Sequence, residues 1–416
     1  MSLVVVGRVA ASLALGSVLL VGCARFDDSA SSPFTPEPTL RGANIDPKKP
    51  SQPPTSTTRP SGPCIDPDPA VVATCLDTTG GLVTLADGAL VAERRTGRIL
   101  KVVPEQPPVE IARVDVDGSG DGGLSDIALS PTYREDGLMY AYITTSSDNR
   151  VVRIAEGGSP KDVLTGIPKG ATGNHGAIDF VSSDQMLVLT GDAGNPGAAA
   201  SAGSLAGKLL RVNSPVPGRT PPPEIAVSGI GTAGDVCRDS KDSIWITDRT
   251  AAEDRLQRLG GDGVVTTMWT WPDRPGVAGC AAATDGVAIS LTRAKALAIA
   301  GADPNTHAVT AAPTLVAQDK YGQLGGAAVG ADGTIWVTTV NKTDGQPGPF
   351  DDRVVRIPPP RAPPRQNGST TQHPRPPLSF VITSPPLGPP PPPAPGRPAA
   401  RPPCRRGPGW PRSRYA

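Results

Sequence analysis

The chain has 416 residues, and its 50 Pro and 48 Gly residues require long loops or linkers. Its formal net charge of +1 is unevenly divided, because residues 361–416 contain nine Arg and no Lys, Asp or Glu; subtracting these nine charges leaves −8 for the rest. An acidic body argues against nucleic acid binding by the folded part. Only 4% of residues are aromatic, so a core must consist mainly of aliphatic side chains.

The first 22 residues have the pattern of a secretory signal. Arg8 is their only charge, and the apolar run that follows it is too short to span a bilayer comfortably. The run ends in Leu20-Val21-Gly22-Cys23, which resembles the bacterial lipobox, where the Cys is acylated after cleavage. The sequence therefore predicts a lipoprotein, with acyl chains such as palmitate on Cys23 holding it at the extracytoplasmic face of the cell membrane. An ordinary signal peptide with a chance Cys is the alternative.

Two Pro-rich segments flank the central part of the chain. Residues 23–63 are rich in Pro, Ser and Thr without apolar periodicity, which predicts a disordered linker. Residues 358–416 include PPPRAPPR and PPLGPPPPPAPGRPAARPP, which predict polyproline II or disorder. This tail is interpreted either as a basic arm for cell-wall polymer, anionic lipid or a Pro-binding partner, or as an out-of-frame translation of a GC-rich gene. The biased composition favours the second interpretation.

Residues 64–357 contain a repeat in which an Asp and a small or polar residue precede an apolar strand. The copies begin at Asp87, Asp136, Asp184, Asp242, Asp285 and Asp332. Their spacing of 43 to 58 residues, by subtraction, is close to the roughly 40–50 of a propeller blade. A further apolar strand follows each copy. The repeat predicts an all-β, six-bladed β-propeller, because a single blade cannot bury both faces. A β-sandwich, the alternative, has no reason to keep a period.

The remaining cysteines suit an oxidising compartment. Cys64 and Cys75 are close in sequence, and Cys237 and Cys280 occupy matching places before the Asp turns of two consecutive repeats. The sequence therefore predicts disulfides within each of these two pairs. A zinc site is the competing interpretation, but there is no CxxC and the three His are scattered.

An Asp-rich stretch before the second repeat resembles a calcium loop in its spacing. Oxygens at positions 1, 3, 5 and 7, a Gly at position 6 and a carboxylate at position 12 match the pattern. The candidate ligands are Asp115, Asp117, Ser119, Asp121 and Asp126. Asp replaces the bidentate Glu at position 12, and a strand follows where a helix is needed. A Gly-rich connection between blades is therefore the favoured interpretation.

Four motifs, in order along the chain, resemble the glucose/sorbosone dehydrogenase family. They are DGGLSDIALSPTY from Asp121, GLMYAYIT from Gly137, LTGDAGNPG from Leu189 and SLAGKLLRV from Ser204. The resemblance implies a six-bladed propeller that oxidises sugars with pyrroloquinoline quinone and Ca²⁺. CARFDDS, NRVVRIAEG and TWPDRPGVAGCAA also resemble a mycobacterial lipoprotein, which implies an actinobacterial cell-envelope protein.

The family's functional residues are mostly missing where the motifs align. The proton-accepting His of the family's HNGG motif aligns with Gly173, with Asn174 retained. His175 is displaced by two residues, or roughly 6–7 Å along a strand, which is beyond hydrogen-bond reach. The family's Arg-Asn pair aligns with Gly231 and Thr232.

The Arg-x-Arg that holds the quinone carboxylates aligns with Gln323 and Gly325. An amide or a glycine cannot replace a guanidinium group at a carboxylate. The losses predict a non-catalytic binding or interaction module of the cell envelope, for carbohydrate or a protein partner. The alternative is a quinone-dependent sugar or aldehyde dehydrogenase with a rearranged site, with His175 as base and Ca²⁺ from the Asp-rich loops.

If a ligand binds at the mouth of the propeller, several polar residues are candidates to contact it. They are Asn174, His175, Asp192, Asn195, Asp248, Arg249, Asp254 and Arg255. Structural roles compete with this one: Asp192 and Asn195 as turn or cap residues, and Asp254 with Arg255 as an exposed ion pair. Trp245 and Trp336, at matching places in two repeats, are expected to pack between blades.

Overall fold

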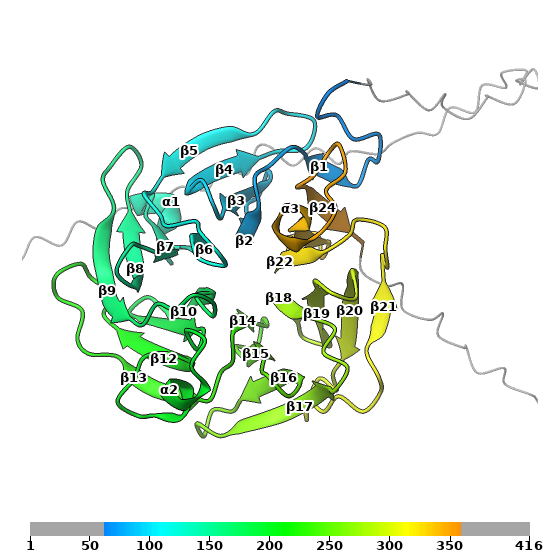
Figure 1. Cartoon of the computed structure of the whole chain (residues 1–416). Coiled ribbons are helices and arrows are strands. Elements are labelled where there is room, and N and C mark those ends of the chain that lie inside the picture. Colours follow the sequence, from blue (N-terminus) through cyan, green and yellow to red (C-terminus); the bar gives the residue numbers. More distant parts are fainter. Residues whose placement is uncertain (1–61, 359–416) are drawn as a thin grey trace, which may run out of the picture.

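The computed structural model describes residues 62–358, and they form six four-stranded antiparallel sheets arranged in a ring (Figure 1). The prediction of an all-β, six-bladed propeller is therefore confirmed. Residues 1–61 and 359–416 lie outside the described residues, and with them the predicted signal, Cys23, most of the predicted linker and the predicted tail. No helix within residues 62–358 is long and apolar enough to cross a membrane.

The first five blades each use four consecutive strands, ordered from the ring axis outward. Blade 1 contains β2 (Thr79–Thr84), β3 (Ala89–Glu93), β4 (Arg98–Val102) and β5 (Val109–Arg113); blade 2 contains β6 (Leu124–Leu129), β7 (Met139–Thr144), β8 (Asn149–Ile154) and β9 (Lys161–Ile167). Blade 3 contains β10 (Gly176–Ser182), β11 (Gln185–Thr190), β12 (Lys208–Asn213) and β13 (Glu224–Ser228); blade 4 contains β14 (Ala233–Arg238), β15 (Ile244–Arg249), β16 (Asp254–Leu259) and β17 (Val265–Trp271). Blade 5 contains β18 (Val277–Ala283), β19 (Gly286–Leu291), β20 (Ala296–Gly301) and β21 (Thr314–Val316). The described residues also form the short helices α1 (Tyr133–Asp136), α2 (Pro196–Ala200) and α3 (Asn341–Asp344).

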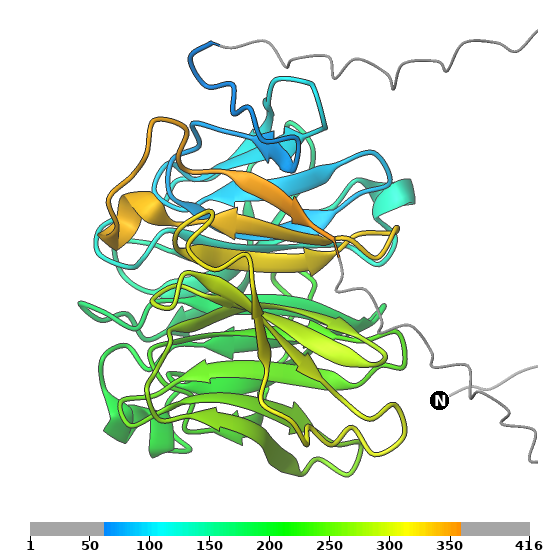
Figure 2. The same ribbon diagram turned by 90° about the vertical axis from the view of Figure 1, so that its right-hand side faces the viewer.

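Blade 6 closes the ring with strands from both ends of the described chain. Its inner strands are β22 (Leu324–Val329), β23 (Ile335–Thr339) and β24 (Val354–Ile357), and β1 (Val71–Ala73) forms its outer edge. Figure 2 shows the blue N-terminal and orange C-terminal parts together at one side of the ring. This strand exchange was missed in the sequence, because three residues are too few to show a strand period.

The repeated Asp residues lie in the turns between the first and second strands of the blades. The Asp332 carboxylate accepts a hydrogen bond from the backbone N–H of Thr334 at 3.0 Å, and Asp136 accepts one from Leu138 at 2.9 Å. An Asp that binds the N–H two residues further on closes such a turn without another side chain. The repeat detected in the sequence is therefore the hairpin at the inner edge of each blade.

Neighbouring blades pack through aliphatic side chains. One cluster joins Tyr142 and Val151 of blade 2 to Phe180 and Val188 of blade 3. Trp245 and Trp336 are buried, with 1% and 6% of their surface exposed, so both serve blade packing as expected. The predicted disulfides are also confirmed, with Cys64 bonded to Cys75 and Cys237 bonded to Cys280.

A buried lysine organises the loop between β11 and β12. Lys208, the first residue of β12, is fully buried. Its Nζ donates hydrogen bonds to the carbonyl oxygens of Ala198 at 3.1 Å, Ala206 at 2.8 Å and Ala199. Two of these carbonyls belong to α2, so the ammonium group holds this helix against blade 3. Burial lowers the pKa of Lys208.

Replacing Lys208 with Ala is expected to lower the free energy of unfolding by about 3 kcal/mol, because three carbonyls lose their donor and the buried side chain leaves a cavity. Denaturant titration followed by circular dichroism measures the change. Lys101→Ala is the control, since Lys101 pairs with Asp87 at the surface and such pairs contribute about 0–1 kcal/mol. Equal losses in the two variants would contradict the assigned role.

Candidate functional site

A cavity of about 770 Å³ lies at the ring axis. The innermost strand of every blade contributes to its wall: β2, β6, β10, β14, β18 and β22. Its volume is within the range of about 300–1,000 Å³ that small-molecule sites occupy. The cavity is therefore the candidate ligand site.

Cationic and polar side chains line the end of the cavity where the innermost strands begin. Arg94, His175, Arg249 and Gln323 belong to this group. Arg94 donates to the carbonyl oxygens of Gly120, at 3.1 Å, and Gly122, and both acceptors precede blade 2. Arg249 of blade 4 donates to the carbonyl oxygen of Val277 in blade 5 at 2.8 Å. Both arginines therefore cross-link neighbouring blades while they line the mouth.

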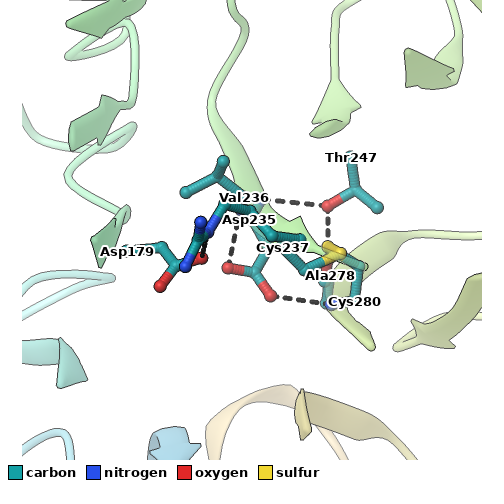
Figure 3. The surroundings of a disulfide bond; sticks show 8 residues. Asp179, Asp235, Val236, Cys237, Thr247, Ala278 and Cys280 are labelled. Atoms are coloured by element: carbon teal, nitrogen blue, oxygen red, sulfur yellow. Dashed lines mark hydrogen bonds and ion pairs between the residues drawn. A yellow bond between two sulfur atoms is a disulfide. The ribbon is translucent and has the colours of Figure 1, made fainter. Parts of the chain in front are cut away.

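Three carboxylates line the cavity on consecutive blades. Asp126 on β6 accepts a hydrogen bond from the N–H of Ile178 on β10 at 2.8 Å. Asp235 on β14 accepts one from the N–H of Cys280 on β18 at 2.7 Å (Figure 3). Asp179 on β10 accepts one from Nε of Arg238 on β14 at 3.0 Å. Each carboxylate thus bridges two neighbouring blades.

The position of these carboxylates favours their protonated forms. Burial raises the pKa of Asp235 to about 7, and the charge of Asp179 adds to the shift. Burial and the charge of Asp235 raise the pKa of Asp126 well above its ordinary value. Burial also raises the pKa of Asp179, although Arg238 opposes this shift. At least one carboxyl group of the cavity, that of Asp235, can therefore be protonated near neutral pH and donate a hydrogen bond.

Glycines occupy the wall on the other three blades. Gly81, Gly279 and Gly326 line the cavity on β2, β18 and β22. A Cβ atom at Gly279 would lie 2.5 Å from the carbonyl oxygen of Gly325, and one at Gly326 would lie 2.8 Å from that of Gly80. Side chains are excluded there because the innermost strands of these blades approach closely. The cavity consequently has one acidic wall and one wall of exposed backbone.

The Cys237–Cys280 disulfide joins β14 to β18 at the cavity wall (Figure 3). The Thr247 hydroxyl donates to the carbonyl oxygen of Ala278 beside it, at 2.5 Å. Blades 4 and 5 are therefore fixed together covalently at the ligand site.

Only His175 and Arg249, among the eight predicted ligand-binding residues, line this cavity. Asn174 is buried, and its side chain binds Asp121 and Gly170. Asp192 accepts from the N–H of Gly194 at 2.8 Å, and Asn195 caps α2 by accepting from the N–H of Ala198 at 3.2 Å. The turn and cap roles expected for Asp192 and Asn195 are therefore present.

Asp254 and Arg255 do not form the exposed ion pair that was considered in the sequence. Asp254 is fully buried and accepts hydrogen bonds from the N–H groups of Gly276, at 2.6 Å, and Val277, at 3.0 Å. Arg255 pairs instead with the buried carboxylate of Asp248. Neighbouring residues of a strand point to opposite faces, so Asp254 and Arg255 cannot share one partner.

The calcium candidates are dispersed over different interactions. Asp117 pairs with Lys169, whose hydrogen bond is the largest cause of the lowered pKa of Asp117. Asp121 accepts from the N–H of Gly173 at 2.6 Å, Asp115 is exposed, and Asp126 lies in the central cavity. Within residues 62–358, no group of three or more His, Cys, Asp or Glu side chains is placed to hold a metal ion. The stretch connects β5 to β6, as the favoured interpretation had it.

The six antiparallel sheets around an axial cavity define the class of a six-bladed β-propeller. The predicted family resemblance is confirmed, because residues 76–230 match the sequence model described as Glucose / Sorbosone dehydrogenase. These residues contain blades 1 to 3. No curated protein sequence matches the chain.

Solved structures extend the similarity around the ring. The PQQ-bound aldose sugar dehydrogenase of Streptomyces coelicolor is 29% identical, with a TM-score of 0.62, over 69% of this chain and 95% of that one. A Thermus thermophilus protein described as a putative oxidoreductase (glucose dehydrogenase) is 26% identical, with a TM-score of 0.59, over 69% of this chain and 98% of that one. The soluble aldose sugar dehydrogenase of Escherichia coli shares the fold at 17% identity, with a TM-score of 0.56 and coverage of 70% and 99%.

The positions aligned with the family's base and clamp arginines are three glycines and one glutamine. Gly173 has φ +74°, and a Cβ there would lie 2.6 Å from the backbone N of Gly194. A Cβ at Gly231 would lie 2.1 Å from the carbonyl oxygen of Arg249. A side chain at either position would require the neighbouring backbone to shift. Gln323 and Gly325 line the cavity, but neither supplies a cation for a quinone carboxylate.

Asp179, Asp235 and Arg94 were missed as site residues in the sequence. A detectable signal exists for the two carboxylates, since each interrupts a short apolar strand that precedes a repeat turn, in AIDFV and GDVC. A charged residue in the middle of such a strand requires a special environment. Arg94 carries no comparable signal, because it follows β3 in an ordinary polar turn.

Proposed function

We propose that this protein is a ligand-binding propeller that lipid on Cys23 anchors at the extracytoplasmic face of the cell membrane. Its ligand occupies the central cavity, and quinone-dependent oxidation is absent. The observation that carries the proposal is the closed backbone at Gly173 and Gly231, where a side chain would collide with neighbouring backbone atoms. Restoring the family's base and clamps would therefore require several substitutions together.

The cavity wall supports a polar, neutral ligand such as an envelope carbohydrate. Asp126, Asp179 and Asp235 offer carboxyl groups, and the glycines on the other wall leave room for a ligand close to the backbone. A hydroxyl group can donate to a carboxylate and accept from a protonated carboxyl group at the same time. A protein partner that inserts a polar loop would use the same groups.

The second candidate function is a quinone-dependent sugar or aldehyde dehydrogenase with a rearranged site. His175 supports it, because this imidazole lines the cavity together with Arg94 and Arg249. The similarity to the PQQ-bound aldose sugar dehydrogenase over most of that chain also supports it. In this function His175 would accept the proton of the substrate hydroxyl group.

Calorimetric titration of the purified protein with pyrroloquinoline quinone and Ca²⁺ distinguishes the ligand-binding propeller from the dehydrogenase. The proposal expects no detectable heat, whereas a functional cofactor site would bind at micromolar affinity or better, near −8 kcal/mol. Circular dichroism on the same sample shows that the protein is folded. Sugar-dependent dye reduction by the loaded protein, lost in His175→Gln, would establish the second candidate and overturn the first.

A further inference from the structure

A second concave site lies on the outer rim, between blades 4 and 5. Its volume is about 340 Å³, and it is distant along the sheets from the central cavity because β17 and β21 are outermost strands (Figure 1). Trp269 and Trp271 of β17 form one side, and Leu315 of β21 lies on the other. We call it the rim groove.

The groove exists because blade 5 has a short outer strand. β17 has seven residues and β21 has three, so the outer edge of blade 5 does not cover the face of blade 4. Trp269 and Trp271 consequently remain half-buried, with ring centroids 6.5 Å apart at 68°. Leu315 is 43% exposed. Two large aromatic rings are thereby held rigidly at the surface by a complete β-sheet.

The lining of the groove favours a proline-rich ligand over a carbohydrate. Prolines complete the wall around the two indoles, at Pro272, Pro275 and Pro313. Thr270 and Asp273 are the polar residues that line the groove. A carbohydrate is covered with hydroxyl groups and would need more hydrogen-bond partners than these two side chains provide. A polyproline II segment suits such a surface, since it packs prolyl rings between aromatic side chains and loses little conformational entropy.

The chain itself carries such a segment beyond the described residues. Residues 385–403 read PPLGPPPPPAPGRPAARPP and contain two Arg and no acidic residue. We propose that the tail is a genuine part of the protein, in place of the out-of-frame interpretation that its composition favours, and that the rim groove binds this segment with the prolyl rings against Trp269 and Trp271. Arg397 or Arg401 then pairs with Asp273.

Reach and charge both support this occupant. β24 ends at Ile357 in blade 6, next to blade 5, and the segment begins 28 residues later by subtraction. An extended linker covers about 3 Å per residue, so 28 residues span roughly 80 Å, more than the roughly 50 Å across a compact domain of about 300 residues. The rest of the chain is acidic, whereas the tail carries nine Arg. Binding within one chain is also favoured by a high effective concentration.

The test uses a fluorescein-labelled peptide of residues 385–403 and two forms of the full chain. One is the unchanged chain, and the other has Pro389–Pro393 replaced by Ser, which frees the groove. Fluorescence anisotropy is expected to show at least tenfold tighter peptide binding to the freed chain, because the tail no longer competes. A peptide with the same five Ser substitutions is expected not to bind.

Groove variants of the freed chain locate the binding. Trp271→Ala and, separately, Leu315→Ser are each expected to weaken peptide binding at least tenfold. Leu315→Ser changes an exposed side chain and keeps the core intact, so its result does not depend on the folding of the Trp variant. Val109→Ala is the matched control, since Val109 is an exposed side chain on the outer strand of blade 1.

Two results would overturn the assignment. The first is peptide binding that is absent from the freed chain or unchanged in both groove variants. The second is quenching of tryptophan fluorescence by a β-linked oligosaccharide, lost in Trp271→Ala, without peptide binding; it would assign the rim groove to carbohydrate.

Discussion

Removing the Cys237–Cys280 disulfide by a double substitution with Ala is expected to lower the free energy of unfolding by about 4 kcal/mol. The bridge closes a loop with a sequence separation of 43, and the chain-entropy relation gives about this value for a loop of that length. The bond also joins the innermost strands of blades 4 and 5, where hydrogen bonds from Thr247 and to Asp235 depend on their alignment. Urea titration of both proteins measures the difference.

The other disulfide provides the comparison. Cys64 and Cys75 are separated by 11 residues, so their replacement by Ala is expected to cost about 3 kcal/mol by the same relation. Identical urea midpoints for the unchanged protein and the Cys237/Cys280 double variant would show that the inter-blade hydrogen bonds alone hold these strands together.

Asp235→Asn is expected to make the protein more stable above pH 7. Burial raises the pKa of this carboxyl group from 3.8 to about 7 in the folded protein, so the folded state binds the proton more tightly than the unfolded state. The contribution of this group to the free energy of unfolding is therefore fully present below about pH 4, and it is lost as the pH rises to about 7. The full cost of ionising this group in the folded state is about 4 kcal/mol. Asn stays neutral and can still accept the hydrogen bond from the N–H of Cys280. Its NH2 group replaces the oxygen that accepts from the N–H of Val236, so the expected gain is smaller than this cost.

Thermal unfolding between pH 5 and pH 8 measures this effect. The melting temperature of the unchanged protein is expected to fall over this range, and that of Asp235→Asn to change less. The neighbouring charges are those of Asp126, Asp179 and Arg238, and all three remain in the variant. Asp184→Asn, in an exposed turn of blade 3, is the matched control. Parallel pH profiles for Asp235→Asn and the unchanged protein would refute the assignment.

Most of the fold could be predicted from the sequence because an Asp between two apolar strands recurs six times. This pattern is visible as residue types, and its spacing gives the length of a blade. The Cys237–Cys280 pair also followed from matching places in consecutive repeats, and the Cys64–Cys75 pair from closeness in sequence. The outer strand β1 gave no such signal, since its pairing with β24 joins residues about 280 positions apart, such as Val71 and Val355. Local patterns cannot report such a contact.

The candidate site was less accessible to sequence reasoning. His175 and Arg249 line the cavity, but Asn174, Asp192, Asp248 and Asp254 turned inward to satisfy backbone N–H groups. In a sequence, a polar residue at the end of a strand looks the same whether it binds a ligand or a backbone N–H group. The acidic wall formed by Asp126, Asp179 and Asp235 depends on which faces of three strands point to the axis, and only the closed ring determines that.

The position of β1 inside a disulfide loop has a mechanical consequence. Cys64 and Cys75 are bonded on either side of Val71–Ala73, so the strand that completes blade 6 lies within the closed loop. A pulling force on the chain before Cys64 therefore passes through the sulfur atoms to Cys75 and bypasses β1. The strand cannot be peeled from β24 while the bond is intact. A propeller that is tethered through its N-terminal side thus keeps its ring closed under load, and a reducing agent removes this protection.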